Sequence, residues 1–268
     1  MKIARWLCLI LPLPVIAAAP QYTLTDLGAI DYPGAGLGWQ LPLNEAANYL
    51  PSLGGVPTVN IVEASFSELQ VGYSAITGSG TTLPPTVHAA LWKGNAVTDL
   101  GTLPGAEAVG SNGASSSALA VNSMGDVVGN SVTQYQTYGG GFSNSTHAFL
   151  WHGGVMRDLG TLAGDPGLSS SAEGVNDTQE VVGTSNAILT ADHSVVSRAF
   201  LYVGGAMYNL YFQVITPPTN IRLTDASGIN CQGNIAATGI DLNDGNYHAF
   251  LLTRQGPPRN CPHQVRVR

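Results

Sequence analysis

The feature that most constrains the fold of this chain is a set of short motifs that recur along it. His-Ala-Phe-Leu-Trp at 147–151 returns as HAALW at 88–92, RAFLY at 198–202 and HAFLL at 248–252. The four motifs begin 59, 51 and 50 residues apart (88, 147, 198 and 248). A period of this length is typical of stacked or radially arranged units. The spacing therefore predicts about four copies of one supersecondary unit.

Two further motifs recur in the same order. DLGTL at 158–162 returns at 99–103 and as DLGAI at 26–30, and ALAVNSMGDVVG at 118–129 matches AEGVNDTQEVVG at 172–183. These segments are short, rich in Val, Leu, Ala and aromatic residues, and separated by Gly, Asn and Asp. Such a pattern predicts strands joined by turns. Each unit is predicted to contain four strands, of the HAFLW, VMRDLGTL, SSAEGVN and EVVGTS types.

The two ends of the chain carry complementary parts of one unit. The DLG-type strand at 22–28 has no HAF-type strand before it, and the HAF-type strand at 247–252 has no DLG-type strand after it. Pairing the two would remove exposed sheet edges. We therefore predict an all-β repeat protein, β-propeller-like, with about four four-stranded units and with the N- and C-terminal strands closing one blade. A barrel or a prism of sheets is the alternative.

Through these three motifs the chain resembles the HAF repeat family of predicted extracellular bacterial proteins. The resemblance covers nearly all of residues 22–253 and rests on His-Ala-Phe, DLGTL and the A-x-A-(V/I)-N-x-x-G-x-V-V-G segment. It implies secretion and a β-repeat architecture, but no established activity and no functional residues. The chain departs from the pattern at Arg198, at the degenerate DLG-type strand near Met207, and at Ser65, where Asn is expected.

The first 19 residues have the composition of a secretory signal. Lys2 and Arg5 precede an apolar run at 6–16, and three alanines at 17–19 form a small-residue cleavage region. The run is too short to span a bilayer. We predict a signal peptide at 1–19, a repeat domain at 20–253 and a basic tail at 254–268. The mature protein is expected to be extracellular or periplasmic, without a transmembrane segment.

Charge is unevenly distributed. The formal net charge is −7, and all 17 carboxylates lie between Asp26 and Asp244. Such an acidic body argues against nucleic acid as a partner. The last 15 residues hold four arginines and no acid. This tail is predicted to be a solvated end, or a strap on the acidic body, rather than a membrane anchor.

Export would leave two cysteines, Cys231 and Cys261. A pair in an oxidising compartment predicts a disulfide, with two separate thiols as the alternative. Cys231 falls in a short turn on the side where the last strand ends. A bridge is therefore expected to staple the closing strand to its neighbouring unit.

The His and Asp residues of the motifs invite a catalytic interpretation, which the repeat itself argues against. The position of His147 is taken by Arg198 in another unit, and a guanidinium that stays protonated cannot act as a general base. Asp158 recurs before Leu-Gly, where a carboxylate can bind backbone N–H groups in a turn. We assign structural roles to all the repeat positions: His88, His147, Arg198, His248, Asp26, Asp99 and Asp158.

Other catalytic and cofactor motifs are absent from the sequence: G-x-S-x-G, H-E-x-x-H, a phosphate-binding glycine loop and C-x-x-C. The segment 241–246 faintly resembles a calcium loop, but its Gly falls one position early and no Glu follows at the twelfth position. A hairpin turn explains it better. We predict no catalytic residue, no metal and no cofactor.

Loop lengths single out one face of the molecule. Connections in a meander alternate between two faces, and the long ones all fall on the same face: 31–57, 76–86, 104–114, 133–146, 186–197 and 211–223. Long loops on a rigid scaffold often carry function. Aromatic rings beside polar groups suit a sugar or peptide ligand; alternatively, they only pack the loops. The candidate ligand-binding residues are Trp39, Tyr49, Tyr135, Tyr138, Phe142, Asp192 and His193.

These observations predict a secreted binding or interaction module that uses this long-loop face. Its partner would be a carbohydrate or another extracellular protein. One alternative is a carbohydrate-active hydrolase with a carboxylate pair in the same loops, and another is a purely structural surface protein.

Overall fold

The computed structural model describes residues 19–30, 60–75, 86–105, 115–137, 139–189, 193–259 and 261. The predicted signal peptide, apart from Ala19, lies outside these ranges. The described residues form an all-β fold of four antiparallel sheets with four strands each. Within the same ranges, no helix has the length and apolar character needed to cross a membrane.

The four sheets are numbered here in chain order. The first sheet contains β2 (Asn60–Phe66), β3 (Leu69–Ala75), β4 (Val87–Lys93) and β5 (Ala96–Gly101). The second sheet contains β6 (Ser116–Val121), β7 (Val127–Gln136), β8 (Phe142–His152) and β9 (Val155–Gly160). The third sheet contains β10 (Ser170–Val175), β11 (Val181–Ile188), β12 (Val195–Val203) and β13 (Ala206–Asn209), followed by a short 3-10 segment, η2 (Leu210–Gln213). The fourth sheet contains β14 (Ile221–Ile229), β15 (Ile235–Asp241), β16 (Tyr247–Arg254) and β1 (Tyr22–Ala29).

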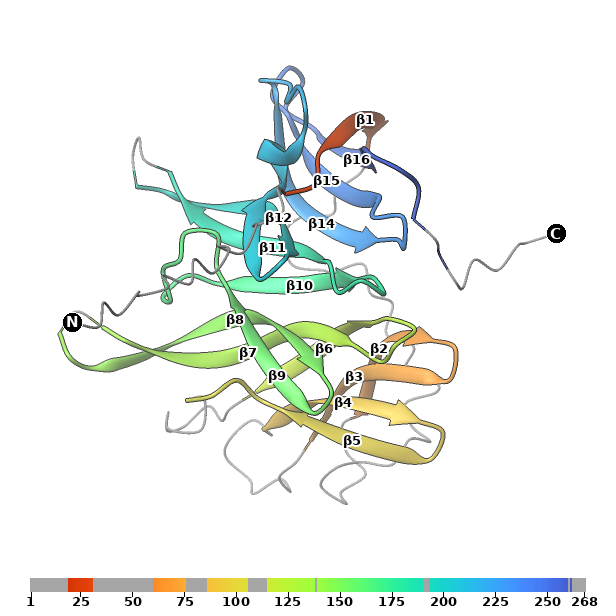
Figure 1. Ribbon diagram of the computed structural model, residues 1–268. Helices are drawn as coiled ribbons and strands as arrows, with labels where there is room; N and C mark the ends of the chain where they lie inside the picture. The colour runs from red at the N-terminus through yellow and green to blue at the C-terminus, as the bar shows by residue number, and fades with distance from the viewer. Residues whose placement is uncertain are drawn as a thin grey trace, which may run out of the picture.

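The strand order of the fourth sheet confirms that the two ends of the chain complete one unit. Its order is β14-β15-β16-β1, so β1 takes the place that β5, β9 and β13 take in the other sheets. Antiparallel pairing runs from Tyr22 opposite Arg254 to Ala29 opposite His248. Figure 1 shows the red β1 beside the blue β16. The last sheet is therefore held together by residues more than 200 positions apart in the sequence.

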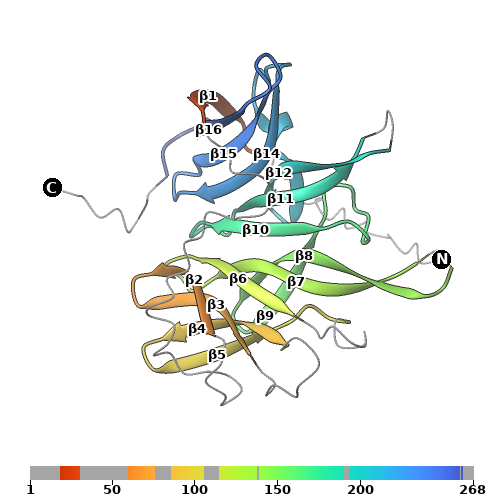
Figure 2. The same cartoon turned by 180° about the vertical axis from the view of Figure 1, so that it is seen from behind.

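The sheets follow one another in a row, from β2–β5 to the sheet that contains both terminal strands (Figures 1 and 2). The first strand of each later sheet, β6, β10 or β14, packs on the preceding sheet. In the described part of the chain, no strand pair from the first and fourth sheets packs to a comparable extent. The number of units, four, agrees with the prediction.

The motifs contain runs of apolar residues because the inner sheets are buried on both faces. Neighbouring residues of a strand point to opposite faces. Phe149 packs in the core between the first and second sheets, and Leu150 in the core between the second and third. Val181 and Val182 likewise enter different cores. Each such side chain contributes about 1.5–3 kcal/mol by burial.

A row of asparagines connects consecutive sheets at their short turns. Asn122 Nδ2 donates to the backbone carbonyl of Asn176 at 2.9 Å, and Asn176 Nδ2 donates to that of Asn230 at 3.3 Å. Inside its own turn, Asn122 Oδ1 accepts from the N–H groups of Met124 and Asp126. The asparagine of the repeat therefore closes its turn and also binds the next unit. The sequence pattern indicated only that asparagine lies in turns between strands; the contact with the next unit is seen only in the structure.

Replacing Asn122 by Ala is expected to lower the free energy of unfolding by about 2 kcal/mol, because it removes several hydrogen bonds of a buried amide. Equilibrium denaturation in urea would measure the change. Asn144, which is exposed on β8, provides the matched control, since Asn144→Ala should change stability by less than about 0.5 kcal/mol. Equal losses of stability at the two positions would contradict a stabilising role for the row of asparagines.

The described start of the basic tail, up to Arg259, is bound to the acidic body, as in the strap arrangement expected for it. Glu180, in the β10–β11 turn of the third sheet, accepts from Arg254 Nη1 at 2.6 Å and from Arg259 Nη1 and Nη2 at 2.5 and 2.7 Å. The Glu180 side chain is only 3 % exposed. Arg254 and Arg259 thus fasten the fourth sheet to the third.

The cysteines are at disulfide distance, with Cα atoms 5.8 Å apart, but the predicted attachment of this bridge to a neighbouring unit is wrong. Cys231 lies in the β14–β15 turn, and β14, β15 and β16 belong to one sheet. The bridge therefore ties the end of β16 back to its own sheet. The contact with the neighbouring sheet is made by Arg254 and Arg259 instead.

Candidate functional site

The histidine and aspartate of the motifs pair with each other in three sheets. Nδ1 of His88, His147 and His248 lies 2.9–3.0 Å from the carboxylate oxygens of Asp99, Asp158 and Asp26, respectively. Each aspartate also accepts from the backbone N–H of the glycine two residues on, at 2.7–2.8 Å. Because the same pair closes the same β-bulge three times, its role is that of a repeated structural link.

The electrostatics of these histidines follow from their partners. Burial lowers the pKa of His147, but the hydrogen bond and charge of Asp158 outweigh it, so the pKa is raised. Hydrogen bonds to Asp26 and Asp244 raise the pKa of His248. The shifts favour the protonated ring, which donates to the carboxylate rather than taking a proton from a substrate.

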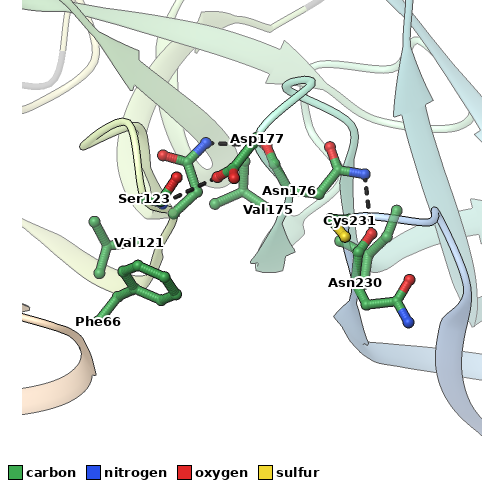
Figure 3. Close-up of a pocket in the computed structure, with 10 residues that line it drawn as sticks. Phe66, Val121, Ser123, Val175, Asn176, Asp177, Asn230 and Cys231 are labelled. Carbon is green, nitrogen blue, oxygen red and sulfur yellow. Dashed lines mark hydrogen bonds between the residues drawn. The ribbon is translucent and has the colours of Figure 1, made fainter. Parts of the chain in front are cut away.

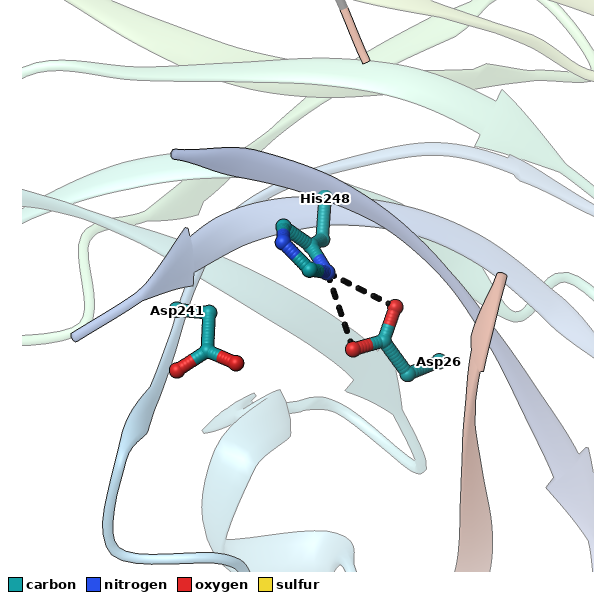
Figure 4. A group of neighbouring side chains, drawn as sticks. All are labelled: Asp26, Asp241 and His248. Atoms are coloured by element: carbon teal, nitrogen blue, oxygen red, sulfur yellow. Dashed lines mark hydrogen bonds and ion pairs between the residues drawn. The ribbon is translucent and has the colours of Figure 1, made fainter. Parts of the chain in front are cut away.

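Asp26, Asp241 and His248 come close together at one end of the fourth sheet (Figure 4). One donor atom from each lies within 4.8 Å of the others, and such a set of oxygens and a nitrogen can bind a metal ion. Each of these groups already has protein partners. Asp241 Oδ1 accepts from Asn220 and from the N–H of Asn243, and His248 bonds Asp26 and Asp244. The cluster is accounted for by the repeat pair and the adjacent hairpin turn.

The third sheet departs from this pair at both positions. Arg198 takes the histidine position, and Asn209 takes the aspartate position, since Asn209 lies opposite Phe200 as Asp158 lies opposite Phe149. The Asn209 side chain accepts from the N–H of Tyr211 and so begins η2. Arg198 donates to the carbonyl of Ser197 at 2.8 Å. The third sheet therefore has a positively charged side chain at the histidine position but no carboxylate at the aspartate position.

A cavity of about 530 Å³ opens beside this exception, at the long-loop end of the third and fourth sheets. Its volume is within the range of small-molecule sites. It is lined by residues from the end of β11 and just after it, from β12, from the end of β13, from η2, from the segment that leads into β14 and from the start of β14. They are Ala187, Ile188, Leu189, Arg198, Asn209, Tyr211, Phe212, Thr219, Arg222 and Leu223. The described lining combines two guanidinium groups with aromatic and aliphatic side chains.

The aromatic part of this cavity is the Tyr211–Phe212 pair. The two rings meet edge to face, with centroids 5.4 Å apart. The Tyr211 hydroxyl donates to the carbonyl of Pro218 at 3.0 Å, which holds the ring in place. The Phe212 ring is 69 % exposed. An exposed aromatic ring at the mouth of a cavity is available to a ligand.

A second cavity, of about 330 Å³, lies at the opposite, short-turn end along the asparagine row (Figure 3). Val121, Val175 and Ile229 contribute its apolar part, and Phe66 stands at one side. Several of its polar groups are engaged between units, as where Asp177 accepts from the N–H of Ser123 at 3.0 Å. The loop lengths in the sequence did not predict this cavity, because the turns beside it are short.

The residues predicted to bind a ligand are not the ones that line these cavities. Trp39, Tyr49, Tyr138 and Asp192 lie outside the described residues. Tyr135 and Phe142 are on the β7–β8 hairpin, and His193 is exposed in a left-handed conformation; none of the three lines either cavity. The Tyr135 ring packs beside Gly167, which agrees with the alternative that loop aromatics serve packing.

A carboxyl pair occurs where the sequence did not indicate one. Glu173 on β10 lies close enough to Asp225 on β14 for the two carboxyl groups to interact, and Thr184 donates to Asp225 at 2.5 Å. Burial, together with the charge of Asp225, raises the pKa of Glu173 to about 8. The pair joins strands of the third and fourth sheets and does not line either cavity. No spacing signal could have found it, because the residues meet only when the sheets pack.

Comparison of the chain with protein-family models, with curated proteins and with solved structures yields no match.

Proposed function

We propose that this protein is a secreted β-repeat binding module whose ligand face is the long-loop end of the sheets. The observation that carries the proposal is the cavity of about 530 Å³ between the third and fourth sheets. It is built by the segments after β11 and after β13, which are two of the long connections. Rigid sheets thus hold ligand-accessible side chains on loops, as binding sites commonly require.

A binding role is favoured over hydrolysis by the chemistry of this lining. Glycoside hydrolysis in most families needs two carboxyl groups beside the bond that is cleaved. The described lining of the long-loop cavity contains two arginines and no Asp or Glu. The alternatives are a carbohydrate-active hydrolase and a purely structural surface protein. No observation within the described residues favours either of them over a binding module.

Secretion and membership of the HAF repeat family belong to the same proposal. The charged start, the apolar run and the alanine cluster of residues 1–19 support export, and the three ordered motifs support the family. A propeller-like ring is the arrangement proposed for the four sheets. The common strand order and the pairing of β1 with β16 within one sheet support it. A closed ring also requires the first and fourth sheets to pack on each other, and their described strands do not pack as consecutive sheets do.

The test is a glycan array probed with the mature protein and with Phe212→Ala. We expect selective binding that the substitution weakens about tenfold or more, because loss of a stacking ring removes on the order of 1–2 kcal/mol. Phe142→Ala is the matched control: Phe142 is 65 % exposed but does not line the cavity. Binding that is equally sensitive to both substitutions would contradict the assigned site. If no glycan is bound, a protein partner or the structural alternative takes its place.

A further inference from the structure

The two arginines that line the long-loop cavity indicate the charge of its ligand. Arg198 comes from β12 in the third sheet, and Arg222 comes from β14 in the fourth. Burial lowers the pKa of Arg198, and the positive charge of Arg222 lowers it further. Two partly buried arginines therefore line the same cavity, where their like charges are unfavourable to each other.

Their positions are set by backbone acceptors rather than by acids. Arg198 Nη1 donates to the carbonyl of Ser197, and Arg222 Nη1 donates to those of Thr219 and Ile221 at 2.9 and 3.0 Å. Within the described ranges, neither guanidinium lies at ion-pair distance from a carboxylate. Carbonyl oxygens do not neutralise a full positive charge, so an anion entering the cavity would relieve the repulsion.

The repeat shows that this charge is not required by the scaffold. Three sheets use a His–Asp pair at the position where the third sheet has Arg198 and Asn209. Among the described residues, the substitution of both members leaves the Arg198 guanidinium without a carboxylate partner, in a chain whose net charge is −7. The exception also coincides with the cavity, because both Arg198 and Asn209 line it.

Resting on the proposed binding function, we propose that the ligand is an acidic saccharide, whose carboxylate is held between Arg198 and Arg222 while a sugar ring stacks on Phe212. A planar carboxylate matches the fork of a guanidinium. The exposed ring of Phe212 and the polar side chains of Asn209 and Thr219, which share the lining, suit the remaining sugar ring and its hydroxyls. These features favour a sugar over a chain of aspartate or glutamate residues, which carries no ring to stack on Phe212.

The experiment is calorimetric titration of the full mature chain with trigalacturonate and with its neutral methyl ester. We expect trigalacturonate to bind at least about tenfold more tightly than the ester. Arg222→Gln should weaken trigalacturonate binding by about the same factor. The double variant R198H/N209D, which restores the pair used in the other three sheets, should do likewise while keeping the thermal unfolding midpoint. Arg157→Gln, at an exposed position outside the cavity, should change the affinity by less than about twofold.

The outcomes separate this inference from the function it rests on. Equal binding of acid and ester, or binding that the arginine variants leave unchanged, overturns the anionic ligand; a loss confined to Phe212→Ala would still support the binding module. Equally tight binding of hexaglutamate overturns the saccharide in favour of an acidic peptide. Absence of any binding that depends on Phe212 or on the arginines overturns both proposals.

Discussion

Glu180→Gln is expected to lower the free energy of unfolding by about 3–5 kcal/mol, which is the usual effect of removing one partner of a buried ion pair. Glu180 is the anion for both arginines of the strap, and it also accepts from Asn176 Nδ2 at 2.8 Å. Glutamine keeps the shape of the side chain but loses its charge. Denaturant unfolding measures the change. Glu68→Gln, in the exposed turn of the first sheet, is the matched control and should be nearly neutral.

The same contact predicts how stability depends on pH. Burial would raise the pKa of Glu180, but hydrogen bonds from Arg259, Asn176 and Arg254 hold it at about 2, below its ordinary 4.5. The stabilisation is therefore complete above about pH 5 and is lost as the pH falls toward 2. The shift corresponds to about 3 kcal/mol. Wild type should lose this much more stability than Glu180→Gln over that interval, and parallel pH profiles would show that the strap carries no such energy.

Gly183→Ala is expected to be as damaging, at about 3–5 kcal/mol, for a reason that lies in the backbone. A Cβ at this position would lie 2.1 Å from the carbonyl oxygen of Ser171 and 2.9 Å from Cα of Ala172. These atoms belong to β10, which cannot move away without losing its pairing with β11. Gly129 in the second sheet meets the carbonyl of Ser117 in the same way, at 2.0 Å. The last residue of the V-V-G motif is thus required by the close approach of two strands.

A strand glycine with open space around it is the control for this substitution. Gly228 on β14 has no atom within 4 Å of an added Cβ. Gly228→Ala should therefore change the unfolding midpoint in urea little, whereas Gly183→Ala should reduce it strongly or prevent folding. Similar midpoints for the two variants would refute the steric explanation.

The fold was largely predictable because its signals are local. A run such as Phe149-Leu150 indicates a strand buried on both faces, and the Asp-Leu-Gly motif indicates the bulge at which Asp158 binds the N–H of Gly160. Comparison of the repeated units with one another also assigned structural roles to His147 and Asp158, since Arg198 occupies the position of His147 in another unit. The face with the long loops could be identified from loop lengths alone.

The candidate site was only partly predictable. Arg198 and the degenerate strand that contains Asn209 stood out as departures from the repeat, but their proximity to Arg222 did not. The predicted aromatic residues that the structure describes, Tyr135 and Phe142, lie away from the cavity, and Phe212 was not among the candidates. Loop composition does not reveal which ring reaches a cavity that forms between two sheets.

The sequence by itself determined the strands, their order within each unit and the pairing of the two chain ends, because hydrogen bonding and side-chain alternation within a strand depend on neighbouring residues. Only the tertiary structure decided which units touch and through which side chains. The angle and spacing of packed sheets place Glu180 against Arg254 and Arg259, Glu173 against Asp225, and Arg198 near Arg222. Those contacts depend on packing between sheets, which a repeated motif does not encode.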